Sequence, residues 1–415
     1  MQENQEIIKK EFLINKKEFL INYNHNGGKM KGRKVLIIFM GITLLFLTLN
    51  LEATWTSKRL TWNSADEEFP AIAIDKNNHI HIIYNTNREY DYYADSELYY
   101  KKSTDGGDSW ITKRLTWTSG DSRFADIAVD SNQNIHVVWQ DKTPGNYEIY
   151  YKKSTDGGNS WITKKLTWTS GDSQFADIAV DSNQNIHVVW QDKTPGNNEI
   201  FYKKSTDGGD SWITKRLTWN SGDSESADVC IDSCQNIHVV WQDNSSGKKA
   251  ILYKKNLSDE TDVWLLQRLT WSYFCENPKI VIDSSDHVHV VWQKVIFIED
   301  YDIFYRNSTN KGESWVTKTE RLCWTSKESE YPAIAVDSNK YIHVVWQDRT
   351  VSTLYPDLFY KKGTDDGASW YPRERLTWSD YDSKTPAIAV DSSNHIYIVW
   401  IDTIYGIGRE VFLKN

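Results

Sequence analysis

The sequence predicts an all-β fold, a seven-bladed β-propeller of four-stranded blades in which an N-terminal strand closes the last blade. The main observation is that the string Arg-Leu-Thr-Trp, or a close variant, occurs seven times among the 415 residues, at spacings of 51 to 55 residues. Seven such units indicate a solenoid, an array or a propeller. The copies end at Trp62, Trp117, Trp168, Trp219, Trp271, Trp324 and Trp378.

Each unit also contains four short β-type runs, which favours the propeller. In the second unit the runs cover residues 124–130, 135–141, 148–153 and 161–168. They are rich in Ile, Val, Tyr and Trp and are bounded by Asp, Asn, Gly and Ser, the pattern of short strands joined by turns. No helical periodicity of useful length follows residue 54. Four strands per unit are typical of a propeller blade.

The two ends of the repeat region complement each other. The last unit stops after its third run, residues 411–414, and lacks a fourth. The first unit is preceded by a spare fourth run, residues 55–62. Pairing these two runs closes the ring and removes the unpaired faces that an open array exposes. We therefore expect seven blades, with the seventh built from both ends of residues 54–415.

The residues before the propeller have the layout of a targeting segment. Residues 1–33 are a polar extension, and Met30 is an alternative start. A basic stretch, residues 29–34, precedes the apolar run 35–49. We interpret residues 34–53 as a secretory signal peptide, with an uncleaved membrane anchor as the alternative. Either interpretation places the propeller outside the cytoplasm, secreted or at the cell surface.

Composition excludes several other functions. The net charge of −9 argues against a nucleic-acid partner, and four Cys rule out a disulfide scaffold. No cofactor is expected, because no Gly-rich loop leads from a strand into a helix. The Asp130 turn resembles a calcium loop, but a hairpin turn explains it and it lacks a downstream Glu ligand. A metal site is not expected either, because one histidine per blade would be spread round the ring, at His81, His136, His187, His238, His289 and His343.

The turn between the third and fourth runs carries a motif. It reads Ser-Thr-Asp-Gly-Gly-Asp-Ser-Trp over residues 103–110 and recurs over 154–161 and 205–212. This resembles the Asp box, Ser-x-Asp-x-Gly-x-x-Trp, of the sialidase-like (BNR repeat) propellers. The resemblance covers residues 54–415 and implies a propeller with these turns on the face away from the active site. The structural Asp-box residues are Asp105, Asp156, Asp207 and, in a variant copy, Asp365.

The resemblance also defines a test for enzymatic activity. Sialidases of the family hold the substrate carboxylate with three arginines and use a Tyr–Glu nucleophile pair and an Asp acid/base. At the position of the first arginine, blade 1 has Glu68 and only blade 2 has an arginine, Arg123. Other arginines fall in the loops that join strands 4→1 and 2→3, the usual binding face of propellers. The candidate ligand-binding residues are Glu68, Arg88, Arg123, Tyr147, Arg349, Tyr355 and Arg409.

These observations favour a non-catalytic propeller, expected to be a monomer, that binds a glycan or a cell-surface protein through its 4→1/2→3 loop face. One alternative is an exo-acting, sialidase-like glycoside hydrolase. A second is a multivalent lectin with sites between the blades. The 20 Trp divide into seven that end the fourth strands, seven that open them and six in the second strands. We therefore expect all of them to belong to the framework.

Overall fold

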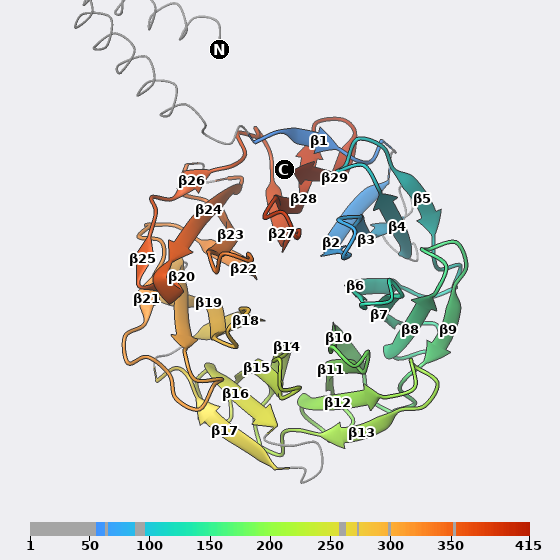
Figure 1. The fold of residues 1–415 in the computed structure, drawn as a ribbon, viewed down its shortest axis with the longest axis horizontal. Coiled ribbons are helices and arrows are strands. Elements are labelled where there is room, and N and C mark those ends of the chain that lie inside the picture. Colours follow the sequence, from blue (N-terminus) through green and yellow to red (C-terminus); the bar gives the residue numbers. More distant parts are fainter. Residues whose placement is uncertain are drawn as a thin grey trace, which may run out of the picture. The chain divides into compact units, whose positions relative to one another are not determined.

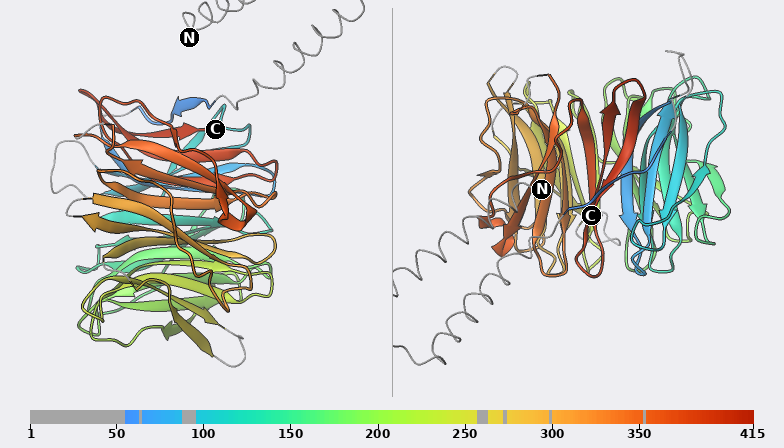
Figure 2. Two further views of the ribbon diagram at one scale, coloured as in Figure 1. Left: turned by 90° about the vertical axis from the view of Figure 1, so that its left-hand side faces the viewer. Right: turned by 90° about the horizontal axis from the view of Figure 1, so that it is seen from above.

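The described part of the chain is a ring of seven blades, each a sheet with four strand positions. The computed structural model describes residues 55–62, 65–87, 96–256, 263–271, 274–297, 300–351 and 354–415. They form seven antiparallel sheets around a central axis (Figure 1), and Figure 2 shows the same ring from two sides. The predicted seven-bladed propeller is confirmed. The predictions for residues 1–33 and 34–53 fall outside the described residues. Within the described part, no helix is long and apolar enough to cross a membrane.

Each blade runs outward from a first strand at the central opening to a fourth strand at the rim (Figure 1). The first strands are β2 (Asp66–Ile74), β6 (Ser122–Val129), β10 (Ser173–Val180), β14 (Ser224–Ile231), β18 (Cys275–Ile282), β22 (Ser329–Val336) and β27 (Ser383–Val390). The second strands are β3 (Ile80–Asn87), β7 (Ile135–Asp141), β11 (Ile186–Asp192), β15 (Ile237–Asp243), β19 (Val288–Phe297), β23 (Ile342–Asp348) and β28 (Ile396–Ile404). The third strands are β4 (Glu97–Ser103), β8 (Glu148–Ser154), β12 (Glu199–Ser205), β16 (Ala250–Asn256), β20 (Asp300–Ser308), β24 (Asp357–Thr364) and β29 (Gly408–Lys414).

The fourth strands are shorter than the sequence predicts. They are β5 (Ile111–Arg114), β9 (Ile162–Lys165), β13 (Ile213–Arg216), β17 (Trp264–Arg268), β21 (Glu320–Arg321) and β1 (Ser57–Arg59), with two pieces in blade 6, β25 (Ser369–Trp370) and β26 (Glu374–Arg375). A short 3₁₀ turn, η1 (Asp365–Gly367), precedes β25. In blade 2 the expected strand 161–168 ends at Lys165, so the motif tryptophan lies beyond the sheet. The remaining residues of the motif lead the chain back toward the axis.

The ring closes as predicted. Strand β1 pairs antiparallel with β29, with Ser57 opposite Lys414 and Arg59 opposite Phe412. Leu60, just after β1, is buried in a core shared with Tyr397, in blade 7, and Ile82, in blade 1. The first described residues therefore complete a sheet whose other strands come from the end of the chain.

The hydrophobic cores lie between blades. One core joins Ile83 and Leu98 of blade 1 to Ile135 and Trp139 of blade 2, and the same arrangement recurs around the ring. The second-strand tryptophans, such as Trp139, are fully buried there. Each blade therefore depends on its neighbours, as expected for a repeat that cannot bury its faces alone.

Every first strand contains a bulge with left-handed backbone. The pairing register shifts after Glu68 in blade 1 and after Arg123 in blade 2. The seven bulged residues have φ between 48° and 53°, which costs energy for residues other than Gly. In five blades a glutamine of the preceding blade's second strand accepts the bulge N–H, with N···O distances of 2.9–3.2 Å. These bonds help to hold the bulges at the rim of the central opening.

Candidate functional site

Seven tryptophans, one from each blade, stand exposed on the surface. The last residue of each Arg-Leu-Thr-Trp copy is 67–76% exposed. The prediction that all tryptophans belong to the framework is wrong for this set. It holds for the second-strand tryptophans, which are buried, and for those that open the fourth strands, which are partly buried. We call the exposed set the tryptophan ring: Trp62, Trp117, Trp168, Trp219, Trp271, Trp324 and Trp378.

The first residue of the motif is fixed by an ion pair inside its own blade. In blade 1, Arg114 pairs with Glu97 at 2.7 Å and donates from Nε to the carbonyl oxygen of Thr116 at 2.7 Å. The other blades follow this pattern except blade 4, whose third strand begins with Ala250. The basic residue thus clamps the turn that follows the fourth strand.

The two middle residues of the motif are used by the core and the sheet edge. Leu115 is buried, and its N–H donates to Leu98 O at 2.8 Å. The hydroxyl oxygen of Thr116 accepts the Leu98 N–H at 2.8 Å, which extends the sheet by one side-chain bond. Equivalent bonds form in blades 2, 3, 4, 6 and 7, and in blade 5 the thiol of Cys323 takes the place of the hydroxyl. The fold therefore requires three of the four motif residues.

Each ring tryptophan lies against at least one cation, and in three copies a cation comes from the next blade. The guanidinium of Arg114 is 5.5 Å from the ring centre of Trp117, and five other copies have the same contact to their own arginine or lysine. In three copies a basic residue of the next blade's third strand also contacts the ring, as Lys254 does with Trp219 at 5.4 Å. Each indole thus has one face or edge fixed by a cation while most of its surface is open to solvent.

The predicted loop-face arginines do not form a free triad. Arg409 pairs with Asp66 at 3.0 Å and with Glu68, which joins blade 7 to blade 1. Arg349 pairs with Glu328 at 3.0 Å, and the fourth candidate, Arg88, lies outside the described residues. Of the predicted site residues, Glu68 and Arg409 are thus brought into direct contact.

The third described arginine belongs to a separate cluster in blade 2. Arg123 pairs with Asp121 at 3.2 Å. The hydroxyl of Tyr147 donates to the same carboxylate at 3.3 Å, and Lys142 lies 5.5 Å from the Tyr147 ring centre. The structure thus joins Arg123 and Tyr147 through a carboxylate that the candidate set omitted.

A row of tyrosines crosses the junction of blades 6 and 7. The ring of Tyr355 lies 5.4 Å from that of Tyr381, and Tyr381 stacks on Tyr405 at 5.9 Å with 19° between the planes. Tyr405 is exposed. Of these three, only Tyr355 was in the predicted set, because the contact depends on loops from two blades.

Three carboxylates, those of Glu276, Glu328 and Glu330, lie close to one another where blades 5 and 6 meet. Burial raises the pKa of Glu330 above its usual range, and the charge of Glu328 adds to the effect. Lys249 of blade 4 pairs with Glu276 at 2.8 Å. A carboxyl group with a raised pKa is a candidate general acid, but within the described residues it has no free arginine beside it to hold an anionic sugar.

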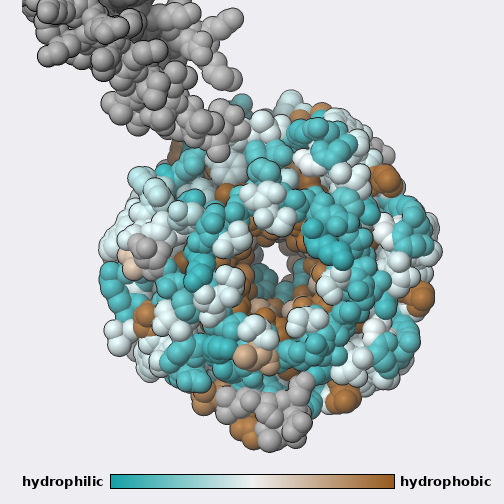
Figure 3. Space-filling model, viewed as in Figure 1, coloured by the Kyte–Doolittle hydropathy of each residue, from teal (hydrophilic) through white to brown (hydrophobic). Residues whose placement is uncertain are grey.

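The central opening is lined by aromatic and charged residues of the first strands. Figure 3 shows hydrophobic residues gathered around its rim. The rings of Phe124 and Phe69 lie 4.1 Å apart, and those of Phe124 and Phe175 lie 4.6 Å apart. These aromatics are bulge residues, so the strained backbone turns them toward their counterparts in the next blade.

Three aspartate side chains form hydrogen bonds between the first strands of neighbouring blades. Asp126 accepts the Ile178 N–H at 3.0 Å, and Asp177 and Asp228 make the same bond to the next blade. Lys279 lies 2.5 Å from Asp228 and 3.9 Å from Asp177. Burial and the nearby carboxylates raise the pKa of Asp177 well above its usual range. The bonds to backbone amides give these groups a structural role.

The Asp-box turns have the local geometry that the motif implies. The Asp105 carboxylate accepts the N–H groups of Asp108 at 3.1 Å and Ser109 at 2.9 Å, and Ser109 also donates its hydroxyl. These bonds hold the pKa of Asp105 below its usual range. Asp156 and Asp207 make equivalent bonds, and Asp365 begins η1. Trp110 donates to the carbonyl oxygen of Gly107, so the turn is closed on both sides.

The histidines of the second strands form buried chains of hydrogen bonds. Nδ1 of His136 lies 2.7 Å from the Tyr151 hydroxyl, and Nε2 lies 3.4 Å from Asp130. The same chain recurs in other blades, and burial lowers the pKa of His81 and of His343 to about 4. These buried bonds give the histidines a structural role within their blades.

Comparisons with known proteins identify the fold. No family model matches the chain, and no curated protein matches its sequence. Among solved structures, a family PL25 ulvan lyase bound to a glucuronic acid–rhamnose-3-sulfate unit aligns with a TM-score of 0.61 at 10% identity, over 86% of this chain and 95% of its own. A Dyadobacter fermentans protein of unknown function aligns with 0.53 at 12% identity, over 87% and 98%. A Trypanosoma rangeli sialidase in complex with sialic acid aligns with 0.52 at 11% identity, over 88% and 59%. The chain therefore has a sialidase-like propeller fold.

Proposed function

We propose that the protein binds glycans without cleaving them, through seven sites between blades that are built on the tryptophan ring. One observation carries the proposal. The fold uses the first three residues of the motif, and leaves the tryptophan 67–76% exposed. An exposed large aromatic side chain in every blade contributes little to packing, and repeated exposed apolar surface is typical of interaction sites.

The chemistry of such a site suits a sugar. The C–H groups on one face of a pyranose ring pack against the indole, and the polarised C–H bonds interact with its π-electrons. The basic residue beside each indole offers N–H donors to hydroxyl groups. Each site is shallow, and we expect it to be weak alone. Seven sites on one rigid ring gain affinity on a multivalent surface by about 10²–10⁴-fold.

The sialidase-like alternative has less support. A catalytic arginine triad needs its guanidinium groups free for the substrate carboxylate. Arg123, Arg349 and Arg409 each pair with a carboxylate of the protein instead. Hydrolysis of a fluorogenic sialoside that disappears in an Arg123→Ala variant would overturn the proposal that the protein acts without catalysis.

A second candidate site of the same class is the tyrosine row on the loop face. Tyr355, Tyr381 and the exposed Tyr405 present adjacent aromatic surfaces at one junction. This site supports the prediction of a single binding face. It is distinguished from the tryptophan ring by stoichiometry, because it offers one site per chain.

A glycan array probed with matched variants tests the proposal. The test variant replaces all seven ring tryptophans with Ala. The control replaces Ile111, Ile162 and Ile213 with Ala, because these residues are 59–64% exposed on the fourth strands of blades 1–3 and lie outside the ring. We expect the test variant to lose glycan binding and the control to keep it. Retention of binding by the seven-fold variant would move the site to the tyrosine row or elsewhere.

The proposed setting is the cell exterior. The basic stretch 29–34 and the apolar run 35–49 support export or anchoring. Exposed glycans and cell-surface proteins are found there. Fractionation of the expressing cells tests this part of the proposal, and recovery of the protein only from the cytoplasm would contradict it.

A further inference from the structure

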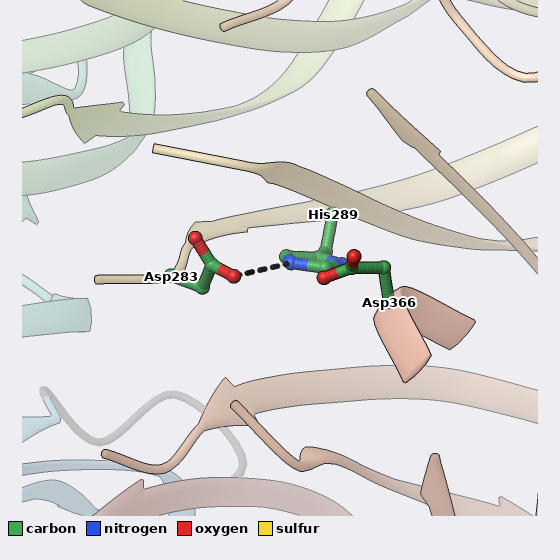
Figure 4. A group of neighbouring side chains, drawn as sticks. All are labelled: Asp283, His289 and Asp366. Atoms are coloured by element: carbon green, nitrogen blue, oxygen red, sulfur yellow. Dashed lines mark ion pairs between the residues drawn. The ribbon is translucent and has the colours of Figure 1, made fainter. Parts of the chain in front are cut away.

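The junction of blades 5 and 6 contains a compact group of metal-binding side chains, the one such group among the residues that the structure describes. Asp283 follows β18, His289 lies in β19 and Asp366 lies in η1 of the next blade. One donor atom from each of the three lies within 4.8 Å of the other two. Figure 4 shows that both carboxylates point toward the imidazole.

Two of these donor atoms are buried and make no hydrogen bond. Oδ2 of Asp283 and Nε2 of His289 have no hydrogen-bond partner in the described part of the chain. The residues are 5% and 0% exposed. Buried polar atoms without a partner are costly and call for an explanation, such as an ion.

In the five other blades that have this histidine, its Nε2 lies closer to the aspartate and is hydrogen-bonded to it. The distances are 3.4 Å for His81–Asp75, 3.4 Å for His136–Asp130, 3.2 Å for His187–Asp181, 3.3 Å for His238–Asp232 and 3.2 Å for His343–Asp337. In blade 5 the distance from His289 to Asp283 is 3.9 Å. The gap is too long for a direct bond and leaves room between the two donors.

Tyr305 fixes the tautomer of His289 in the form that binds a metal. Its hydroxyl lies 2.9 Å from the carbonyl oxygen of Asp366, which only accepts, so the hydroxyl donates there. Its oxygen then accepts the proton of His289 Nδ1, which is 2.7 Å away. The neutral imidazole therefore carries its lone pair on Nε2, facing the two carboxylates. Such an outer hydrogen bond is the usual support of a metal-binding histidine.

His287 supplies a fourth donor. Without an ion, its Nδ1–H donates to Oδ1 of Asp366 at 2.8 Å and lies 3.3 Å from Oδ2 of Asp283. A metal takes the other neutral tautomer, with the proton on Nε2 and the Nδ1 lone pair facing the ion. Donor atoms around a tetrahedral ion at about 2.0–2.1 Å stand about 3.4 Å apart, so small shifts suffice. The side chains of His287 and Asp366 are 19% and 33% exposed, which leaves a route for the ion from solvent.

The group is specific to one junction because two sequence features coincide there. Asp366 occupies a left-handed position, φ 55°, where the equivalent turns of blades 1–3 have Gly106, Gly157 and Gly208. Blade 1 also has an Asp-His-His set, in Asp75, His79 and His81, but the next blade has Gly157 at the position of Asp366. The junction of blades 1 and 2 thus serves as a comparison that lacks a carboxylate at the Asp366 position.

We infer that the junction of blades 5 and 6 binds one divalent transition metal of the zinc class, held by Asp283, His287, His289 and Asp366. Two imidazoles and two carboxylates in a tetrahedral group favour Zn²⁺ over the hard cations Ca²⁺ and Mg²⁺. The ion ties the turn of blade 5 to that of blade 6. The sequence predicted no metal site because the second-strand histidines are spread round the ring. The proposed site needs only one of them, since its other donors come from two adjacent turns.

The test is the binding of Zn²⁺ to the chelator-treated protein, measured by calorimetry. We expect one ion per chain and a higher melting temperature on binding. Two test variants, Asp366→Gly and His287→Asn, introduce residues that occupy the same positions in sister blades, and we expect both to fold. Each should weaken Zn²⁺ binding at least ~100-fold. The control, Asp207→Asn, removes an exposed Asp-box carboxylate and should leave one bound ion.

Co²⁺ adds a readout of geometry. A tetrahedral site with nitrogen and oxygen donors gives strong visible absorption, and we expect this band in the parent and its loss in Asp366→Gly. The inference is overturned if the parent does not bind Zn²⁺, or if Asp366→Gly and His287→Asn bind it as tightly as the parent does.

Discussion

At the scale of single residues, the charges lining the central opening show how burial and pairing oppose each other. One carboxylate oxygen of Asp177 accepts the Val229 N–H. The negative charges of Asp228 and Asp126 repel the charge of Asp177. The attraction of Lys279 goes mainly to Asp228, at 2.5 Å. Ionisation of Asp177 is therefore costly in the native state.

Replacement of Asp177 with Asn should stabilise the protein. The folded-state pKa of Asp177 is raised, so the unfolded chain loses this proton at a lower pH than the folded chain does. Stability therefore falls as pH rises from the ordinary aspartate pKa to the raised value. Asn keeps an oxygen for the Val229 N–H and removes the charge. We expect a gain in stability at pH 7 that shrinks toward pH 4, measured by urea unfolding. The control, Asp228→Asn, breaks the pair with Lys279 and should destabilise. Equal effects of the two substitutions would contradict the account.

The buried histidines give the opposite dependence on pH. Burial lowers the pKa of His81 and of His343 to about 4, whereas an unfolded histidine titrates near 6.5. Stability should thus be constant above about pH 6.5 and fall as pH drops toward 4, by up to about 3 kcal/mol per histidine. Melting temperatures of the parent and a His343→Gln variant test this. A slope between pH 6.5 and 4 that is the same in both would exclude His343 as a contributor.

At the scale of elements, the Arg-Leu-Thr-Trp segment separates residues that the fold needs from one that it does not. Thr167 is buried and its hydroxyl oxygen accepts the Ile149 N–H at 2.8 Å. Trp168, the next residue, is exposed and lies beyond β9. The proposed function rests on this division between neighbours.

The division predicts unequal costs for two substitutions one residue apart. Thr167→Val leaves the Ile149 N–H without a partner and should destabilise by about 1–2 kcal/mol. Trp168→Ala removes little packing and should change stability by less than about 0.5 kcal/mol. Chemical unfolding of both variants is the measurement. A cost for Trp168→Ala as large as that for Thr167→Val would make the tryptophan part of the framework after all.

The sequence predicted the blades well because their determinants are local and repeated. The strand 135–141 is observed with its predicted bounds, because apolar residues and turn residues delimit it. The exposure of Trp168 could not be predicted, because it depends on where β9 ends and how the chain turns toward the next blade. Asp366 and His287 are 79 residues apart, and their contact depends on two adjacent turns. Alignment of the Asp-box turns offers one signal for them, since Asp366 stands where blades 1–3 have Gly.

At the scale of the whole molecule, stability depends on closure of the ring. Each hydrophobic core joins two blades, and the one between blades 7 and 1 includes Leu60, which follows β1. Strand β1 also covers the edge of β29, which would otherwise remain open for pairing. The pairing of the two ends of residues 55–415 thus closes the ring of seven blades.

Removal of β1 should weaken the entire propeller. A chain starting at residue 65 loses the burial of Leu60 and the pairing of β29, which we expect to cost at least about 3 kcal/mol. It should also associate through the exposed edge of β29. Thermal unfolding and size-exclusion chromatography test this, with a chain starting at residue 55 as the control. Equal stability of the two chains would show that the β1–β29 pairing is dispensable.

The central claim is that the tryptophan ring provides seven glycan sites, and counting bound ligand tests it most directly. The measurement is a calorimetric titration with a monovalent sugar identified by the glycan array, performed on the parent and on variants with one, three and seven ring tryptophans replaced by Ala. The account predicts a stoichiometry near seven that falls with each tryptophan removed. A stoichiometry of one that is unchanged in the seven-fold variant would contradict it and place the site on the loop face.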